Sequence, residues 1–398
     1  MNFHFLLEAE RCPKAAALRH AEYPQIWTKH GYPDKPHASA ITGRIVHASV
    51  ERIARELALD HCVRLQDPKA IEVLKKMGGY STVISQFTES VLATFADNPR
   101  YIPVSDTISS IVRSRVPQIR EQIQVLLSRL VWSGGAGPVI EVNGSTTESP
   151  TSTRRQSPLP LGTHFEVELR DEALRWKGFA DLIEVQGSDV AIVDFKTGDK
   201  SDVHELQIRI YALLWLRDAE LNPAATPAAK LILSYPRGDE VLPGITQAQA
   251  NELAAELKTR TDRVRESLHA EKLKANLSAE HCEKCQVRHL CPEYWTPMRQ
   301  KAAPRANGKQ MYFDDVELVI TQRRGDTVWD AMCSTSDLLL PSAKVMVRIQ
   351  PIASVIEDQL IPGARIRLTD ALVSIRDGDT PLVHMMNSTE VLVAPPSA

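Results

Sequence analysis

Asp194 and Lys196 are the residues of this chain whose types and spacing point most directly to chemistry. They stand one residue apart at the end of the apolar run VAIVDFKTG, residues 190–198. Because side chains alternate along a strand, both project from one side of a sheet and Phe195 from the other. A carboxylate can hold a hard divalent cation, and a lysine beside it can orient a water and offset phosphate charge. The pair therefore indicates metal-assisted phosphodiester hydrolysis, with a surface ion pair as the alternative.

Asp181 supplies a second carboxylate, on the segment GFADLIEV that is predicted to form the preceding strand. The turn QGSD, residues 186–189, would join the two strands in an antiparallel hairpin and bring both acids together. Two carboxylates at one point repel each other unless a cation or a proton lies between them. Their convergence favours a metal site.

Residues 204–218 are predicted to form a helix with a wide buried face, because apolar residues recur there with helical spacing. Gln207 and Tyr211 are four residues apart and share one face of that helix. They either border the site or are ordinary helix residues, with Tyr211 in the core.

The ordered set Gly-x-x-Asp, Asp-x-Lys-Thr-Gly and Gln-x-x-x-Tyr resembles the motifs of RecB-like nucleases of the PD-(D/E)XK superfamily. The resemblance implies an α/β core with a mixed central sheet flanked by helices. It also implies that Asp181 and Asp194 bind Mg²⁺ or Mn²⁺, that Lys196 is catalytic, and that Gln207 and Tyr211 support the site and contact DNA.

His47 matches a further position of this resemblance. The segment GRIVHASVERIAREL, residues 43–57, is predicted to be an amphipathic helix with His47 at the edge of its apolar stripe. In RecB-like nucleases such a histidine is a metal ligand, whereas a lone histidine is usually structural. The family also has an acidic residue on an earlier strand, and the sequence leaves Glu141, Glu166 and Glu168 as alternatives.

Clustered cysteines form a second signal. Cys282, Cys285 and Cys291 need a fourth ligand for a tetrahedral site, and a nearby histidine would favour Zn²⁺. The sequence also resembles the CRISPR-associated iron–sulfur exonucleases and AddB nuclease domains, which carry one cysteine before the core and three after it. That resemblance implies a structural [4Fe–4S] cluster bound by the triad and Cys12. Cys62 and Cys333 are expected to be ordinary apolar residues.

Length and composition fit a two-domain chain. With 398 residues and a hydrophobic fraction of 43%, it can bury a sizeable core, and its net charge of −3 provides no global basic signature of nucleic-acid binding. We expect a nuclease domain over residues 1–300, with a helical lobe at 40–132 and a flexible insertion at 134–162. Cys12 and the triad at 282–291 would cross-link the two ends of this domain through the bound cluster. No secretory signal or membrane span is recognised, so we expect a cytoplasmic protein without disulfides.

Residues 309–398 differ from the rest of the chain in their sequence pattern. Short strand-like segments alternate there with turn signals such as RRGD and RDGD. They predict a small C-terminal all-β barrel resembling an OB-fold. Eight Lys or Arg against twelve Asp or Glu give this region a balance of −4. Docking to a protein partner therefore has nearly equal weight with binding of nucleic acid.

Taken together, these features predict a metal-dependent DNA nuclease, acting on single-stranded DNA in repair, recombination or antiviral defence of the CRISPR type. The alternative is a catalytically inactive, nuclease-like DNA-binding or scaffolding subunit of a larger complex. Exonuclease or endonuclease action, cleavage polarity, preference for DNA over RNA and oligomeric state are not readable from the sequence.

Overall fold

The computed structural model describes residues 1–132, 158–296, 305–306, 311–349, 358–376 and 378–394. The chain forms two compact units, each built from separate chain segments. The first unit comprises Met1–Leu7, Pro36–Ala96 and Asp106–Glu266, and the second comprises Glu8–Lys35, Asp97–Ser105 and Ser267–Ala398.

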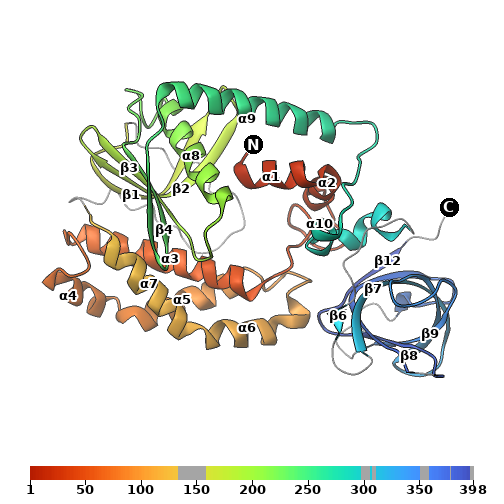
Figure 1. Cartoon of the computed structure of the whole chain (residues 1–398). Helices are drawn as coiled ribbons and strands as arrows, with labels where there is room; N and C mark the ends of the chain where they lie inside the picture. Colours follow the sequence, from red (N-terminus) through yellow and green to blue (C-terminus); the bar gives the residue numbers. More distant parts are fainter. Residues whose placement is uncertain (133–157, 297–304, 307–310, 350–357, 377, 395–398) are drawn as a thin grey trace. The chain divides into compact units, whose positions relative to one another are not determined.

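A five-stranded mixed sheet lies at the centre of the first unit (Figure 1). Its strands follow the chain order β1 (Gly162–Asp171), β2 (Trp176–Gln186), β3 (Asp189–Phe195), β4 (Lys230–Tyr235) and β5 (Gly238–Pro243). Neighbours are antiparallel except β3 and β4, which are parallel and are connected by helix α8 (Asp202–Arg217). The predicted hairpin is confirmed, and Gly187 takes a φ of 64° in its turn, a conformation that glycine adopts readily.

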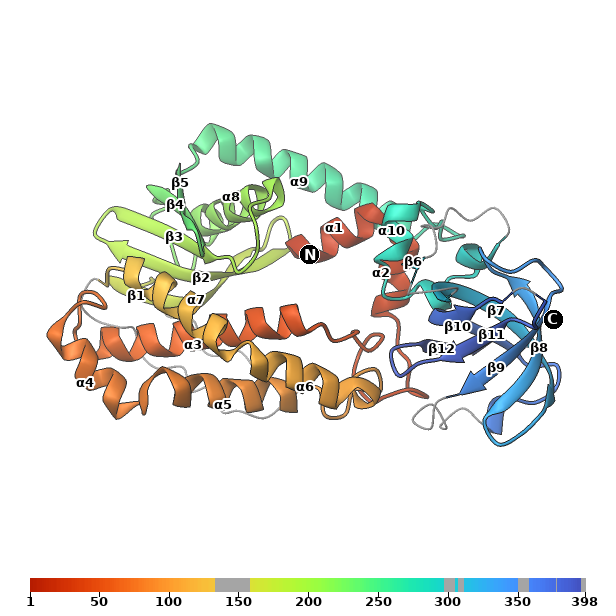
Figure 2. The same cartoon turned by 60° about the horizontal axis from the view of Figure 1, so that its bottom comes forward.

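Helices cover both faces of this sheet, as predicted (Figures 1 and 2). Helix α8 packs against β1 to β4, and α9 (Gln247–Leu268) lies on the same side. Thr246 begins α9 with a reciprocal cap, in which Gln249 N donates to Thr246 Oγ1 and Thr246 N donates to Gln249 Oε1. The opposite face carries the helical lobe, whose α3 (Ala38–Leu59) includes the predicted helix at 43–57.

The lobe also contains α4 (Pro68–Lys76), α5 (Gly79–Ala93), α6 (Ser105–Ser114) and α7 (Val116–Arg129). Ile45, Ile53 and Leu57 of α3 are fully buried, and α3 packs against α5 and α7. Pro117 lies in the first turn of α7, where a missing N–H costs no intrahelical bond.

The second unit contains a closed five-stranded barrel. Its members, with two short flanking strands, are β6 (Arg305–Ala306), β7 (Met311–Arg323), β8 (Val328–Thr335), β9 (Lys344–Ile349), β10 (Arg365–Ser374), β11 (Leu382–Met385) and β12 (Glu390–Ala394). The ring runs β7–β8–β9–β11–β10 and closes where β10 pairs with β7. Trp329, Val347 and Ile366 belong to its apolar core. The predicted C-terminal barrel is thus confirmed.

Short helices carry the cysteine-containing segments. Helix α1 (Phe3–Arg11) leads to α2 (Pro13–His20), and α10 (Ala279–Glu283) is followed by the 3-10 turns η2 (Arg288–Leu290) and η3 (Pro292–Trp295). A further 3-10 turn, η1 (Ile102–Val104), precedes α6. No helix of the described residues is both long and apolar enough to span a bilayer.

Candidate active site

Three carboxylates stand in a row across β1, β2 and β3. The pairs Phe165↔Leu182 and Val167↔Ala180 leave Glu166 opposite Asp181. The pair Leu182↔Val193, continued by one residue, sets Asp181 opposite Asp194. The ladder between β2 and β3 opens at this point, and the backbone amide of Phe195 donates instead to Asp181 Oδ2 at 2.6 Å. Sheet register therefore brings the two predicted metal-binding acids together.

The Asp194 carboxylate is buried between a second carboxylate and an ammonium group. Its side chain is buried, Lys196 Nζ lies 2.5 Å from its Oδ2 atom, and that oxygen lacks a hydrogen bond of good geometry within the described residues. Burial, followed by repulsion from Asp181, raises the pKa of Asp194 to about 6 despite the nearby ammonium. A site with this electrostatic balance favours an additional cation.

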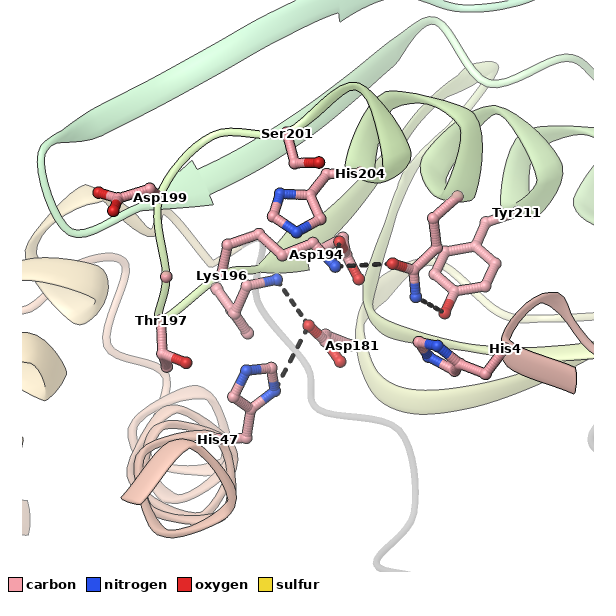
Figure 3. Close-up of a pocket in the computed structure, with 13 residues that line it drawn as sticks. His4, His47, Asp181, Asp194, Lys196, Thr197, Asp199, Ser201, His204 and Tyr211 are labelled. Atoms are coloured by element: carbon pink, nitrogen blue, oxygen red, sulfur yellow. Dashed lines mark hydrogen bonds and ion pairs between the residues drawn. The ribbon is translucent and has the colours of Figure 1, made fainter. Parts of the chain in front are cut away.

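A hydrogen-bonded chain holds Lys196 from the helix side (Figure 3). Lys196 Nζ donates to Gln207 Oε1 at 2.8 Å, and Gln207 Nε2 donates to the Tyr211 hydroxyl at 2.7 Å. Gln207 and Tyr211 lie one turn apart on α8, and both are buried. The shared helix face inferred from their spacing thus serves to fix the lysine ammonium.

His47 approaches the row from α3, on the other face of the sheet (Figure 3). Its Nδ1 atom lies 3.6 Å from Asp181 Oδ2. Burial alone would lower the pKa of His47, but the hydrogen bond and charge of Asp181 outweigh it and raise the pKa. The close approach of α3 depends on Gly43, because a Cβ there would lie 3.1 Å from Thr197 Oγ1.

Of the three alternative glutamates, the structure brings Glu166 to the row. Burial of its carboxyl, followed by the charges of Asp181 and Glu51, raises the pKa of Glu166 to about 7. Glu166 has a φ of 50°, which is unusual for a residue with a side chain. Glu168 instead pairs with Arg170, its Oε1 atom lying 2.5 Å from Arg170 Nε, and Glu141 lies outside the described residues.

A cavity of about 470 Å³ is lined by the predicted residues His47, Asp181, Asp194, Lys196, Gln207 and Tyr211, but not by Glu166. Part of its wall consists of residues that the sequence did not predict. His4, Thr197, Asp199, Ser201 and His204 line it together with the predicted residues (Figure 3). Burial, together with the charge of Lys196, lowers the pKa of His4 and of His204. His204 falls within the predicted helix, three residues before Gln207, and therefore lies close to Gln207 on the helix surface. This spacing could have predicted that His204 borders the site.

Sequence comparison agrees with this geometry. A family model described as the PD-(D/E)XK nuclease superfamily matches residues 6–292, which is more than half of the chain. The chain belongs to the PD-(D/E)XK nuclease superfamily. Members of this superfamily are generally nucleases, and they usually use Mg²⁺ or a similar divalent metal. No curated protein sequence matches the chain.

Matches to solved structures are weak. The crystal structure of SSO0001 aligns at 19% identity over 34% of this chain and 62% of that chain, with a TM-score of 0.21. A murine DNA-binding protein bound to double-stranded DNA aligns at 10% identity over 60% and 95% of the two chains, with a TM-score of 0.15. At these TM-scores neither match bears on fold or function.

The carboxylate row fits the divalent metal of the superfamily in charge and in ligand type. Asp181 and Asp194 offer the hard oxygen atoms that Mg²⁺ and Mn²⁺ prefer, and one buried oxygen of Asp194 still lacks a hydrogen bond. Within the part of the chain that the structure describes, no three His, Cys, Asp or Glu side chains converge as a preformed metal site. The Lys196 ammonium lies against Asp194 instead.

The four cysteines of the predicted cluster all lie in the second unit. Cys12 caps α2 and also accepts a bond from Asn276 N at 3.4 Å, and it lies close enough to Cys282 and Cys285 to affect both thiols. Cys291 shares an apolar cluster with Cys282, and burial, aided by Glu293, raises its pKa to about 12. The structure thus gathers residues more than 260 positions apart, without itself showing a cluster.

The remaining two cysteines agree with the sequence-based expectation. Cys62 and Cys333 are buried, the latter in the barrel core. All six cysteines lie in the described part of the chain, and no disulfide joins any of them.

Proposed function

We propose that this chain is a metal-dependent DNA nuclease that hydrolyses phosphodiester bonds of single-stranded DNA. The observation that carries the proposal is the meeting of Asp181, Asp194 and Lys196 at one cavity. Asp181 lies on β2, Asp194 on β3 and Lys196 directly after β3, and the Gln207–Tyr211 pair holds the lysine in place. Membership of the superfamily supports nuclease chemistry, whereas the preference for single strands rests on the resemblance to RecB-like nucleases.

Each side chain has a distinct task in this proposal. Asp181, Asp194 and His47 would hold the divalent cation, which supplies Lewis-acid stabilisation of charge on the scissile phosphate. Lys196 lies beside the carboxylates and has ammonium protons with which to orient a water toward phosphorus. Gln207 fixes the direction of that ammonium, so that little reorganisation is needed during the reaction.

End-labelled single- and double-stranded DNA test the proposal directly. With Mg²⁺ or Mn²⁺, the wild type should cleave single strands, and Asp194→Asn and Lys196→Met should each lower the rate at least about 100-fold. Asp189→Asn is the matched control, because it makes the same change at the exposed opposite end of β3. Equal cleavage by wild type and Asp194→Asn would contradict the enzyme assignment.

A non-catalytic role in DNA binding or scaffolding is the second candidate, and the same assay separates the two. Tight binding of DNA by a wild type that cleaves neither substrate with either metal would favour this candidate. The five-strand order of the barrel, with β9 and β11 parallel, is compatible with an OB-like module for nucleic acid or for a protein partner.

A [4Fe–4S] cluster held by Cys12, Cys282, Cys285 and Cys291 belongs to the same proposal. The gathering of Cys12 with Cys282 and Cys285 supports it. An anaerobic preparation should be brown and contain about four iron atoms per chain, and Cys285→Ser should remove colour and iron together. A colourless preparation with stoichiometric zinc would instead identify a zinc site.

A further inference from the structure

The face of β2 that carries Asp181 continues past the cavity. Trp176 and Gly178 face the helices α8 and α9: Trp176 Nε1 donates to Thr261 Oγ1, and a Cβ at Gly178 would meet the Tyr211 ring. Because strand side chains alternate, Lys177 and Phe179 share the other face with Asp181. Phe179 is 41% exposed, and Lys177 is also exposed.

The neighbouring strand β1 extends this surface with charged side chains at defined positions. Glu168 of β1 is paired across from Phe179, and Arg170 is paired across from Lys177. Glu168 is itself engaged by Arg170 at 2.5 Å, so its charge is largely balanced. Along one face the side chains therefore change from carboxylates, through an exposed aromatic ring, to the exposed Lys177, while the charge of Arg170 is balanced by Glu168.

Two side chains on this face remain open to solvent. Phe179 keeps 41% of its surface exposed, and that part of the ring contributes no hydrophobic burial to the fold. Lys177 is exposed opposite Arg170, whose charge is already balanced by Glu168. Both groups gain a partner if an anion lies at Lys177 and a flat apolar group covers Phe179. A nucleotide carries both groups, a phosphate and an aromatic base.

We propose that Phe179 is a stacking platform for one unpaired nucleobase next to the scissile phosphate, and that Lys177 binds the following phosphate. Side chains on one strand face recur every 7 Å or so, which suits successive groups of an extended nucleic-acid strand. The base of a duplex is stacked and paired on both sides and cannot cover the ring in this way. The platform therefore selects single strands, and it rests on the proposed nuclease function.

Binding of a fluorescein-labelled dodecathymidylate to the full chain in EDTA, followed by anisotropy, tests the platform. Phe179→Ala should weaken binding about tenfold, whereas Phe179→Trp should bind as well as wild type or better, since stacking on an aromatic ring tolerates any base. Lys177→Ala should reduce the salt dependence of log Kd by about one phosphate contact. Phe87→Ala on α5 and Lys69→Ala on α4 are matched controls and should bind like wild type.

An abasic scan supplies a second measurement that does not depend on the stability of a variant. Oligonucleotides with one abasic position, moved along the strand beside a fixed cleavage end, should bind wild type weakly at one register and Phe179→Ala equally at all registers. Equal affinity of Phe179→Ala and wild type, or no weak register, overturns the platform. That outcome would leave the nuclease proposal intact. The nuclease proposal fails only if Asp194→Asn cleaves DNA as well as wild type.

Discussion

Gly178 and Tyr211 are in such close contact that a single methyl group would not fit between them. A Cβ added at Gly178 would lie 2.8 Å from Cε1 of the Tyr211 ring. The glycine on β2 therefore lets α8 approach the sheet, and that approach brings Gln207 within hydrogen-bonding distance of Lys196. Gly178, three residues before Asp181, thus contributes to the site by leaving room for Tyr211 and α8.

Gly178→Ala is expected to push the Tyr211 ring and α8 outward and to misplace Lys196. Overpacking of this kind typically costs about 1–3 kcal/mol of stability, and a displacement of catalytic groups of about 1 Å can reduce the rate 100-fold. Cleavage of end-labelled DNA and thermal unfolding measure the two effects. Gly325→Ala, where no atom lies within 4 Å of the added group, should leave both unchanged.

Tyr211→Phe should leave the buried Gln207 amide without the acceptor that it now uses. Loss of one partner in a buried hydrogen bond destabilises by about 1–3 kcal/mol, which urea unfolding can measure. Gln207→Leu should have the larger effect on kcat, because it removes the direct contact to Lys196 Nζ. If kcat of Gln207→Leu equals that of wild type, the positioning role is wrong.

Asp194 should make the metal-free protein less stable as the pH rises from about 4 to 6. An aspartate is half ionised near pH 4 when unfolded, whereas in the fold its pKa is raised to about 6, so the unfolded state ionises first and is favoured. The shift corresponds to roughly 3 kcal/mol. In EDTA, the fall in melting temperature across this window should be smaller for Asp194→Asn, and equal falls would contradict the assignment.

Divalent metal should reverse that destabilisation. A ligand that binds only the folded state at 100 times its Kd contributes about 2.7 kcal/mol. Adding Mg²⁺ or Mn²⁺ at neutral pH should therefore raise the melting temperature of the wild type and of Asp189→Asn, but not that of Asp194→Asn. Equal shifts for all three proteins would place the metal elsewhere on the chain.

Arg288 is expected to be essential for the second unit. It lies between Cys285 and Cys291 and donates to Asp315 at 2.8 Å and to Asp370 at 2.9 Å, both on barrel strands. Removing one member of a buried ionic network typically costs about 3–5 kcal/mol. Arg288→Met should show this loss in urea unfolding, whereas Arg324→Met, which breaks an exposed pair on the barrel, should cost less than about 1 kcal/mol.

The sequence predicted those parts of the site whose geometry follows from local periodicity. Asp194 lies on β3 and Lys196 follows its last residue, and alternation with a period of two brings both side chains to one cavity. Gln207 and Tyr211 share a helix face because they are one turn apart. The hairpin of β2 and β3 and the C-terminal barrel were predicted for the same reason, because turn and alternation signals are local. The mixed sheet was implied instead by the resemblance to RecB-like nucleases.

Other parts of the site depend on contacts that no local pattern encodes. His4 reaches the cavity from a helix at the start of the chain, and nothing in its own neighbourhood indicates this. Alternation placed Glu166 and Glu168 on one face but could not choose between them. The choice follows from the register with β2, which sets Glu166 opposite Asp181, and from the pairing of Glu168 with Arg170.

The discontinuous make-up of the second unit has a consequence for biosynthesis. A ribosome completes every segment of the first unit by Glu266, whereas Glu8–Lys35 belongs with residues from Ser267 onward. All segments of the first unit are therefore made before the last segment of the second unit. Cys12 can meet Cys282, Cys285 and Cys291 only after that late segment has been synthesised.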